Sequence, residues 1–184
     1  MSITTRRGDR GTTTLYGESR RRRKDAQRIV AIGDVDELNS HLGLVASLLP
    51  RRDRKIKNLV LEVQKTLFEI GAELATPPRR KPLFSIDTKK VRELERLLDD
   101  LEGSLFWPGL FILPGGHPAA AEAHVARSVC RRAERELVRL SRQEKVNPQV
   151  LKYINRLSDF LFVVARTINK KAKIKETTWA GKRG

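Results

Sequence analysis

The sequence contains little cysteine, few aromatic residues and no long apolar run. Cys130 is the only cysteine, so no disulfide can form within the chain, and a reducing compartment is expected. Aromatic residues make up only 5%, whereas Leu, Ala, Arg, Lys and Glu are abundant, and this balance favours helices over a β-sandwich or barrel. No stretch approaches the ~18 consecutive apolar residues of a membrane-spanning helix, and no secretion signal is evident at the N-terminus. We therefore expect an all-α protein of the cytoplasm with no membrane partner.

Positive charge, by contrast, is in large excess. The chain of 184 residues has the length of a single domain, and 38 Lys and Arg against 22 Asp and Glu give it a net charge of +16. Residues 1–25, 119–145 and 166–184 carry net charges of +5, +3 and +6, which is nearly all of the excess. Charge concentrated in this way points to phosphates in a nucleotide or nucleic acid, or to an anionic membrane surface. A basic surface in contact with solvent explains it equally well.

Apolar residues in the first half of the chain recur at the spacing of helices. Within residues 38–49 and 56–74 they alternate in steps of four and three, so each segment presents one apolar stripe. The two segments are predicted to form antiparallel helices joined near residues 50–52. A third, shorter helix is predicted to begin near Asp87, whose carboxylate suits an N-cap.

The second half of the chain predicts two further helices. Pro118 suits the first turn of a fourth helix, and Asn147 followed by Pro148 suits the N-cap and first turn of a fifth. Residues 160–164 are apolar nearly all round, so this section should be central or at a subunit contact. We expect a single domain that spans residues 1–184 and consists of an N-terminal arm (1–25), a five-helix bundle (26–171) and a basic C-terminal tail (172–184).

The N-terminal arm combines glycine, hydroxyl and arginine side chains over residues 5–17. Such a loop can wrap phosphates, because glycine permits close approach of the backbone while hydroxyl and guanidinium groups donate hydrogen bonds. Neither a Walker A loop nor a dinucleotide-binding fingerprint is present. Composition alone therefore leaves two interpretations open, a flexible basic tail and a phosphate-binding loop.

Arginines of the predicted fourth helix form a second candidate site. They lie four residues apart and so share one stripe: Arg127, Arg131, Arg135 and Arg139. The first two adjoin the apolar seam, where partly buried arginines need carboxylate or phosphate partners. Candidate partners on the other helices are Asp36, Glu37 and Asp159. A structural ion network and a ligand site fit this pattern equally well.

Metal and nucleophile chemistry has little support in the sequence. His41, His117 and His124 form no close ligand pair and Cys130 stands alone, so no side-chain metal cluster is expected. No hydrolytic triad is evident either. Few aromatic residues are available for base stacking, and no zinc-finger or helix-turn-helix motif is present, so nucleic acid is not the expected partner.

Six motifs occur in the order of a known family. They are Thr5-Arg6-x-Gly8-Asp9-x-Gly11-Thr12-Thr13-x-Leu15, Lys24…Arg28, Gly33-x-Val35-Asp36-Glu37-Leu38-Asn39, Phe111-Ile112-Leu113-Pro114-Gly115-Gly116, His124-x-Ala126-Arg127-x-Val129-Cys130-Arg131-Arg132-Ala133-Glu134-Arg135 and Asn155-Arg156-Leu157-Ser158-Asp159-x-Leu161-Phe162. On these residues, and along nearly its whole length, the chain resembles the trimeric ATP:cob(I)alamin adenosyltransferases of the propanediol-utilisation type.

The resemblance implies a five-helix bundle that assembles as a homotrimer, with ATP in clefts between adjacent subunits. The implied ATP contacts are Thr5, Arg6, Gly8, Asp9, Gly11, Thr12, Thr13, Lys24, Arg28, Arg127, Arg131 and Asn155. Arg127 and Arg131 are also implied as catalytic groups, together with Glu134 and with Asp36, which would pair with Arg127 across the interface. Phe111 and Asp159 are implied on the cobalamin side, where Phe111 would form an apolar wall below the corrin ring.

The implied reaction is attack of cobalt(I) on the ribose 5′ carbon of ATP, which gives adenosylcobalamin and triphosphate. Cobalt(I) is itself the nucleophile, so the protein would align the reactants and neutralise the departing triphosphate through arginines, Lys24 and a magnesium ion bound by the ATP phosphates. A reductase and a cobalamin-dependent enzyme would be further partners. The alternative function, suggested by the basic runs at residues 20–24 and 170–175, is a non-catalytic helical bundle that binds a nucleotide or nucleic acid.

Overall fold

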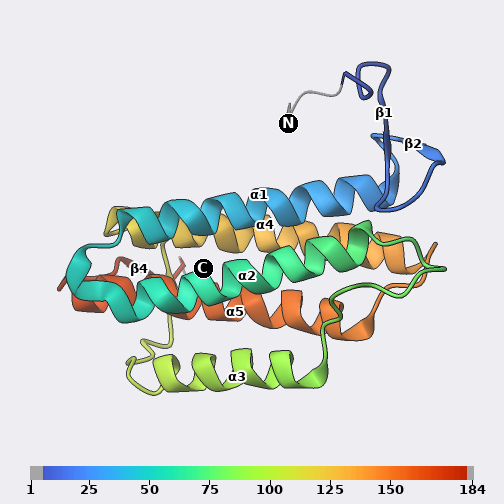
Figure 1. Cartoon of the computed structure of the whole chain (residues 1–184). Coiled ribbons are helices and arrows are strands. Elements are labelled where there is room, and N and C mark those ends of the chain that lie inside the picture. Colours follow the sequence, from blue (N-terminus) through green and yellow to red (C-terminus); the bar gives the residue numbers. More distant parts are fainter. Residues whose placement is uncertain (1–5, 182–184) are drawn as a thin grey trace.

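The computed structural model describes residues 6–181, and helices dominate this range (Figure 1). The first two, α1 (Gln27–Leu48) and α2 (Arg54–Ala75), run antiparallel and are joined by Pro50 and the short 3-10 helix η1 (Arg51–Asp53). The apolar stripe of α2 is buried as its spacing predicted. The predicted helical hairpin and the position of its turn are therefore confirmed.

The remaining helices begin where capping residues predicted. They are α3 (Thr88–Glu102), α4 (Pro118–Ser141) and α5 (Pro148–Lys171). The Asp87 carboxylate accepts a hydrogen bond from the backbone N–H of the third helical residue, and the Asn147 side chain accepts one from the second. His117 caps α4 in the same way, with Pro118 in the first turn. These side chains satisfy backbone donors that a helix leaves unpaired at its start.

The core lies between four long helices, with α3 packed outside against α5 (Figure 1). Helix α1 packs against α2 and α4, and α4 packs against α5. Phe160, Leu161 and Val164 of α5 are completely buried, which confirms that the section apolar all round is central. Within the described range, no helix is both long and apolar enough to span a membrane.

Two short antiparallel ribbons flank the bundle, and the sequence predicted neither. Strands β1 (Thr12–Thr14) and β2 (Arg21–Arg23) pair within the N-terminal arm, which projects from the end where α1 begins (Figure 1). Strands β3 (Phe111–Ile112) and β4 (Thr178–Trp179) pair near the opposite end. The expected C-terminal tail therefore returns to the bundle through β4, and the described part of the arm is a folded hairpin.

Candidate functional site

The N-terminal arm brings most of its predicted ATP contacts into one small structure. Arg21 donates from Nε to the Thr12 hydroxyl at 2.7 Å, while the Lys24 backbone N–H donates to the Gly11 carbonyl at 2.9 Å. The Lys24 ammonium lies so near Gly8 that a Cβ there would come within 3.1 Å of it. Arg6, Asp9 and Thr13 lie on the same hairpin, and Thr5 lies outside the described residues. The arm thus gathers cations, hydroxyls and exposed backbone around one loop, as phosphate binding requires.

The arm is docked on the bundle by a few specific contacts. Leu15 is buried, and the backbone N–H of Tyr16 donates to the carbonyl of Ala75 at the end of α2 at 2.9 Å. Gly17 has a φ of +69° and lies directly against the Arg80 guanidinium, where a Cβ would collide with it. A side chain at this turn would be strained by the positive φ and would have to displace the Arg80 guanidinium.

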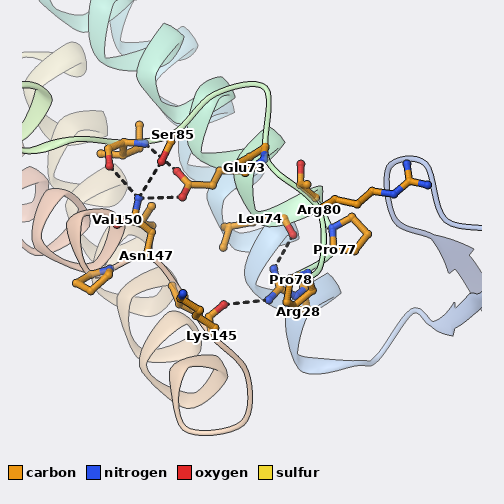
Figure 2. A pocket seen from close by; sticks show the side chains of 15 residues that line it. Arg28, Glu73, Leu74, Pro77, Pro78, Arg80, Ser85, Lys145, Asn147 and Val150 are labelled. Atoms are coloured by element: carbon orange, nitrogen blue, oxygen red, sulfur yellow. Dashed lines mark hydrogen bonds between the residues drawn. The ribbon is translucent and has the colours of Figure 1, made fainter.

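Arg28 differs from the other predicted ATP contacts because its guanidinium is used inside the subunit. It is only 4% exposed and donates to Glu144 and to the Leu74 carbonyl, both at 2.8 Å, and to the Lys145 carbonyl at 3.4 Å. Figure 2 shows it lining a cavity of about 450 Å³ that no other predicted site residue lines. Within the described residues the Arg28 guanidinium is therefore used inside the fold, and its assignment as an ATP contact stays a prediction.

Two predicted arginines on α4 are, by contrast, without an ion-pair partner among residues 6–181. Arg127 is half-buried, and its Nε is buried without a hydrogen-bond partner in the described structure. Arg131 is exposed one turn further along. Between α4 and α5, the Asn155 amide donates to the Glu134 carboxylate at 2.8 Å. The structure therefore brings Asn155 and Glu134 together and leaves Arg127 and Arg131 available to a partner outside the subunit.

The carboxylates proposed as partners for these arginines pair elsewhere. Glu37 bonds Arg132, which also reaches Asp34 at 3.3 Å. Asp159 pairs with Arg156 on its own helix at 2.9 Å. The expected pairing of Glu37 or Asp159 with Arg127 or Arg131 is therefore wrong within one subunit. Each carboxylate pairs instead with a neighbouring arginine that is closer to it. Asp36 is exposed, and between residues 6 and 181 its carboxylate has no ion-pair partner.

Phe111, the predicted cobalamin contact, belongs to one aromatic pair, and a second aromatic cluster forms around Arg166. Phe111 is 75% exposed, and its ring centroid lies 6.2 Å from that of Trp179, its partner in the β3–β4 register. Phe162 of α5 packs edge-on against Trp107 at 6.1 Å. The Arg166 guanidinium lies over both of these rings and is 6% exposed. The sequence analysis did not predict the positions of Trp179 and Arg166. The only local signal was Trp179 itself, an aromatic residue within a short threonine-rich stretch of the basic tail.

Neither His124 nor Cys130 is poised for chemistry. Burial, and then the charge of Arg127, lower the pKa of His124 to about 4, so the imidazole is neutral at neutral pH. Burial raises the pKa of the Cys130 thiol far above its usual range, and its Sγ contacts the Ile154 carbonyl at 3.2 Å. Within residues 6–181, no group of three His, Cys, Asp or Glu side chains is placed to hold a metal ion.

The candidate phosphate and aromatic regions lie at opposite ends of α4. Phe111 lies shortly before the first residue of α4, whereas the arm is attached just after α4 ends, where Arg22 pairs with Glu144. The helix has 24 residues, and at 1.5 Å per residue it is about 36 Å long. Arg127 and Arg131 lie between these ends, near the middle of the helix.

Comparison with known proteins decides the family. The model of the cobalamin adenosyltransferase family matches residues 3–168. The chain belongs to this family. A cobalamin adenosyltransferase from Cupriavidus metallidurans is 43% identical over 181 residues, covering 98% of this chain and 95% of the relative. A corrinoid adenosyltransferase from Bacillus subtilis is 37% identical over 176 residues, covering 95% and 90%.

A solved adenosyltransferase structure has the same fold as this chain. It is a phenylalanine-to-alanine variant of the PduO-type ATP:corrinoid adenosyltransferase from Lactobacillus reuteri, complexed with cobalamin and ATP. The TM-score is 0.91 at 37% sequence identity, and the match covers 98% of this chain and 100% of that one. The family expected from the six motifs, and the all-α five-helix fold, are thereby confirmed.

Proposed function

We propose that the protein transfers the 5′-deoxyadenosyl group of ATP to cob(I)alamin. The observation that carries this proposal is the family match across residues 3–168, which includes the folded arm, the α4 arginines and Phe111. In the reaction, the electron pair of cobalt(I) forms the bond to the ribose 5′ carbon. The bond from that carbon to oxygen breaks, and its electron pair leaves with triphosphate. Adenosylcobalamin and triphosphate are the products, and no protein nucleophile or general base takes part.

The arm and the α4 arginines would hold the triphosphate. Gly8 and Gly11 open the backbone of the arm, while Thr12 and Thr13 offer hydroxyl donors beside Lys24. Arg6 and Asp9 would complete the arm contacts, and Thr5 belongs to the same motif. Arg127 and Arg131 would neutralise the charge that develops on the leaving phosphate oxygen, with Asn155 and Glu134 ordering the nucleotide beside them. Such groups lower the barrier because they are in place before the charge develops.

A magnesium ion would be held mainly by the phosphates of ATP. The described residues offer it no cluster of three ligating side chains, and Asp9 on the exposed arm is the one carboxylate among the proposed phosphate contacts. The ion would neutralise part of the triphosphate charge when ATP is bound.

The Phe111 ribbon would receive the corrin ring. An exposed phenylalanine and the neighbouring tryptophan, Trp179, form an apolar wall that supplies no ligand to cobalt. Such a wall favours four-coordinate cobalt(II), which makes reduction to cobalt(I) less difficult. Asp159 lies exposed on α5, and we assign it to the cobalamin side with Phe111.

A homotrimer would bring the two substrates together. The arm and Phe111 of one subunit lie at opposite ends of a helix about 36 Å long, whereas reacting atoms must approach to ~3–3.5 Å. The arm of one subunit would therefore meet α4 and α5 of its neighbour, where Arg127 Nε has no hydrogen-bond partner among residues 6–181 of its own subunit. Asp36 is the unpaired carboxylate proposed to bond Arg127 across that contact.

The pairing of Arg127 with Asp36 is tested by the dissociation constant of the trimer. We expect Arg127→Ala and Asp36→Asn each to raise it by about tenfold or more, because each leaves one charge of the pair unmatched. The double variant should dissociate no more readily than the worse single variant. Arg135→Ala on the same helix is the control. Dissociation constants equal to that of the wild type in both single variants, measured by sedimentation, would refute the pairing.

The reaction itself is tested by absorption spectroscopy under anaerobic conditions. Purified protein, ATP, magnesium and chemically reduced cobalamin are expected to convert the cobalt(I) spectrum into that of a light-sensitive alkylcobalamin. A parallel sample without ATP should keep the cobalt(I) spectrum. Retention of that spectrum despite measured ATP binding would favour a nucleotide-binding bundle without activity.

The competing nucleic-acid function gains no specific support. Three of the five consecutive cations at residues 20–24 have their guanidinium groups engaged within the arm or with Asp25, Glu18 and Glu144. The basic run is therefore largely the framework of the hairpin. A reductase that supplies cobalt(I) and an enzyme that consumes adenosylcobalamin are the reaction classes that must precede and follow this step.

A further inference from the structure

The N-terminal arm is connected to the bundle by a chain of ion pairs that includes none of the proposed substrate contacts. Glu144, in the turn between α4 and α5, lies at the centre of this chain. We propose that Glu144 is a positioning residue that holds the arm in the shape that receives the triphosphate of ATP. This inference rests on the proposed function of the arm.

The part of this ion-pair chain that lies against the bundle is rigid. One Glu144 oxygen, Oε2, accepts from Arg28 Nε at 2.8 Å. The remaining guanidinium nitrogens of Arg28 bond the Leu74 and Lys145 carbonyls, so α1, the end of α2 and the α4–α5 turn share one buried cation (Figure 2). Because Arg28 is 4% exposed and bonded on three sides, it fixes the Glu144 carboxylate in one position.

The other end of the ion-pair chain reaches the arm through Arg22. The other Glu144 oxygen, Oε1, lies 3.9 Å from an Arg22 nitrogen, and Glu18 pairs with Arg22 at 3.1 Å. The side chain of Arg22 is 22% exposed, against 79% for its neighbour Arg23, so Arg22 is the arginine of β2 that faces the bundle. In the ribbon, Arg22 is directly opposite Thr13, a proposed ATP contact. A shift of Arg22 therefore shifts Thr13.

Glu144 is also hydrogen-bonded to the end of α4, the helix that carries Arg127 and Arg131. Its backbone N–H donates to the Leu140 carbonyl at 2.8 Å, which extends the last turn of α4. Helix α4 is thus bonded directly to the arm of its own subunit at one end. Its middle section carries Arg127 and Arg131.

The expected consequence is a change in ATP affinity with little change in chemistry. Without Glu144, the arm stays attached through Leu15 and the Tyr16 hydrogen bond, but β2 loses its fixed orientation. ATP must then order the arm as it binds, and this cost weakens the ground state and the transition state equally. A loss of that kind raises KM and leaves kcat nearly unchanged.

The test compares Glu144→Gln and Arg22→Met with wild type in the adenosylation assay. We expect each variant to raise the KM for ATP by about tenfold, with kcat and the KM for cobalamin within about twofold. The double variant should also show about a tenfold rise, because both changes break the same connection. Arg22→Met leaves the buried Glu144–Arg28 pair intact, so it tests the proposal even if Glu144→Gln folds poorly. Glu62→Gln, which removes an exposed ion pair with Lys65 on α2, is the matched control.

A second measurement needs no substrate. Chymotrypsin cleavage after Tyr16, an exposed site that every variant retains, should be several-fold faster in Glu144→Gln and Arg22→Met than in wild type or Glu62→Gln. Unchanged KM for ATP in both arm variants, or a fall in kcat alone, would overturn the proposal. Absence of turnover in the wild type would instead refute the proposed function, and unchanged proteolysis would then refute the connection itself.

Discussion

At one end of the bundle the β1–β2 arm is held by ion pairs, and at the other end the β3–β4 ribbon is held by aromatic rings around one arginine. The arm pairs residues close in sequence, such as Thr12 with Arg23. The ribbon pairs Phe111 with Trp179, which lie far apart in the chain. Both ribbons are only two or three residues long, so each depends on its attachment to the bundle for stability.

The two attachments differ in burial. The pair that reaches the arm, Arg22 with Glu144, has side chains 22% and 29% exposed, whereas Arg166 and its partner Glu176 at the ribbon are 6% and 18% exposed. Arg166 also donates to the Phe106 carbonyl at 2.7 Å, so it joins α5, the segment after α3 and the C-terminal segment. Charged groups left near water can meet a triphosphate, while the exposed rings of Phe111 and Trp179 can form an apolar wall. The chemistry of each substrate thus matches the end of the bundle to which we assign it.

The largest expected effect is on the charged side of this comparison. Arg131→Ala should lower turnover by about 100-fold or more, because it removes a cation that stabilises the leaving triphosphate in the transition state. Steady-state adenosylation kinetics measure this, and sedimentation should show an intact oligomer. Arg135→Ala, one turn further on the same helix and also exposed, should retain near-normal activity. Equal activity in the two variants would remove Arg131 from the site.

The second effect concerns stability at the aromatic side. Glu176→Gln should lower the free energy of unfolding by about 2 kcal/mol, since Arg166 is buried and would lose its charged partner. Glu95→Gln, which breaks a more exposed pair with Arg156, should cost less than about 1 kcal/mol. Urea denaturation followed by circular dichroism measures both. Equal losses would mean that burial does not distinguish the ribbon attachment from a surface ion pair.

The third effect separates the two substrates. Phe111→Ala should lower kcat/KM for cobalamin by about tenfold, because a large exposed aromatic surface is lost from the corrin wall, while the KM for ATP stays within about twofold. Phe68→Ala on α2 also removes an exposed phenylalanine and should change neither constant. A rise in the KM for ATP in Phe111→Ala would contradict the assignment of the two ends to different substrates.

The smallest effect is expected from salt. Higher potassium chloride should raise the KM for ATP about threefold and change the KM for cobalamin by less than about twofold, because screening weakens exposed charges and leaves apolar contacts intact. Titration of the salt at fixed pH in the same assay measures both constants. Parallel changes in the two constants would show that the ends do not differ in electrostatic character.

The helices of the bundle could be predicted because their signals are local. The apolar stripe of α2 and the caps at Asp87 and Asn147 each depend on residues within one or two helical turns. The six motifs gave the family for the same reason, since each is a short run of neighbours. The burial of residues 160–164 also followed from their composition alone.

Contacts between distant segments could not be predicted in this way. Nothing near Trp179 indicates that it pairs with Phe111, and nothing near Arg28 distinguishes a structural arginine from one that binds phosphate. Identical side chains on one helix also have different partners: Arg132 meets two carboxylates of α1, whereas Arg127 meets none.

By itself, the sequence determined the helices, their order, the family and the residues available to bind an anion. Only the tertiary structure decided which arginines are consumed within the fold and which remain free, because a guanidinium is neutralised by whatever carboxylate the packing brings within a few ångströms. Glu144 illustrates the division. Its place after α4 follows from local sequence, but its position between Arg22 and Arg28 exists only once α1, the arm and the α4–α5 turn have met.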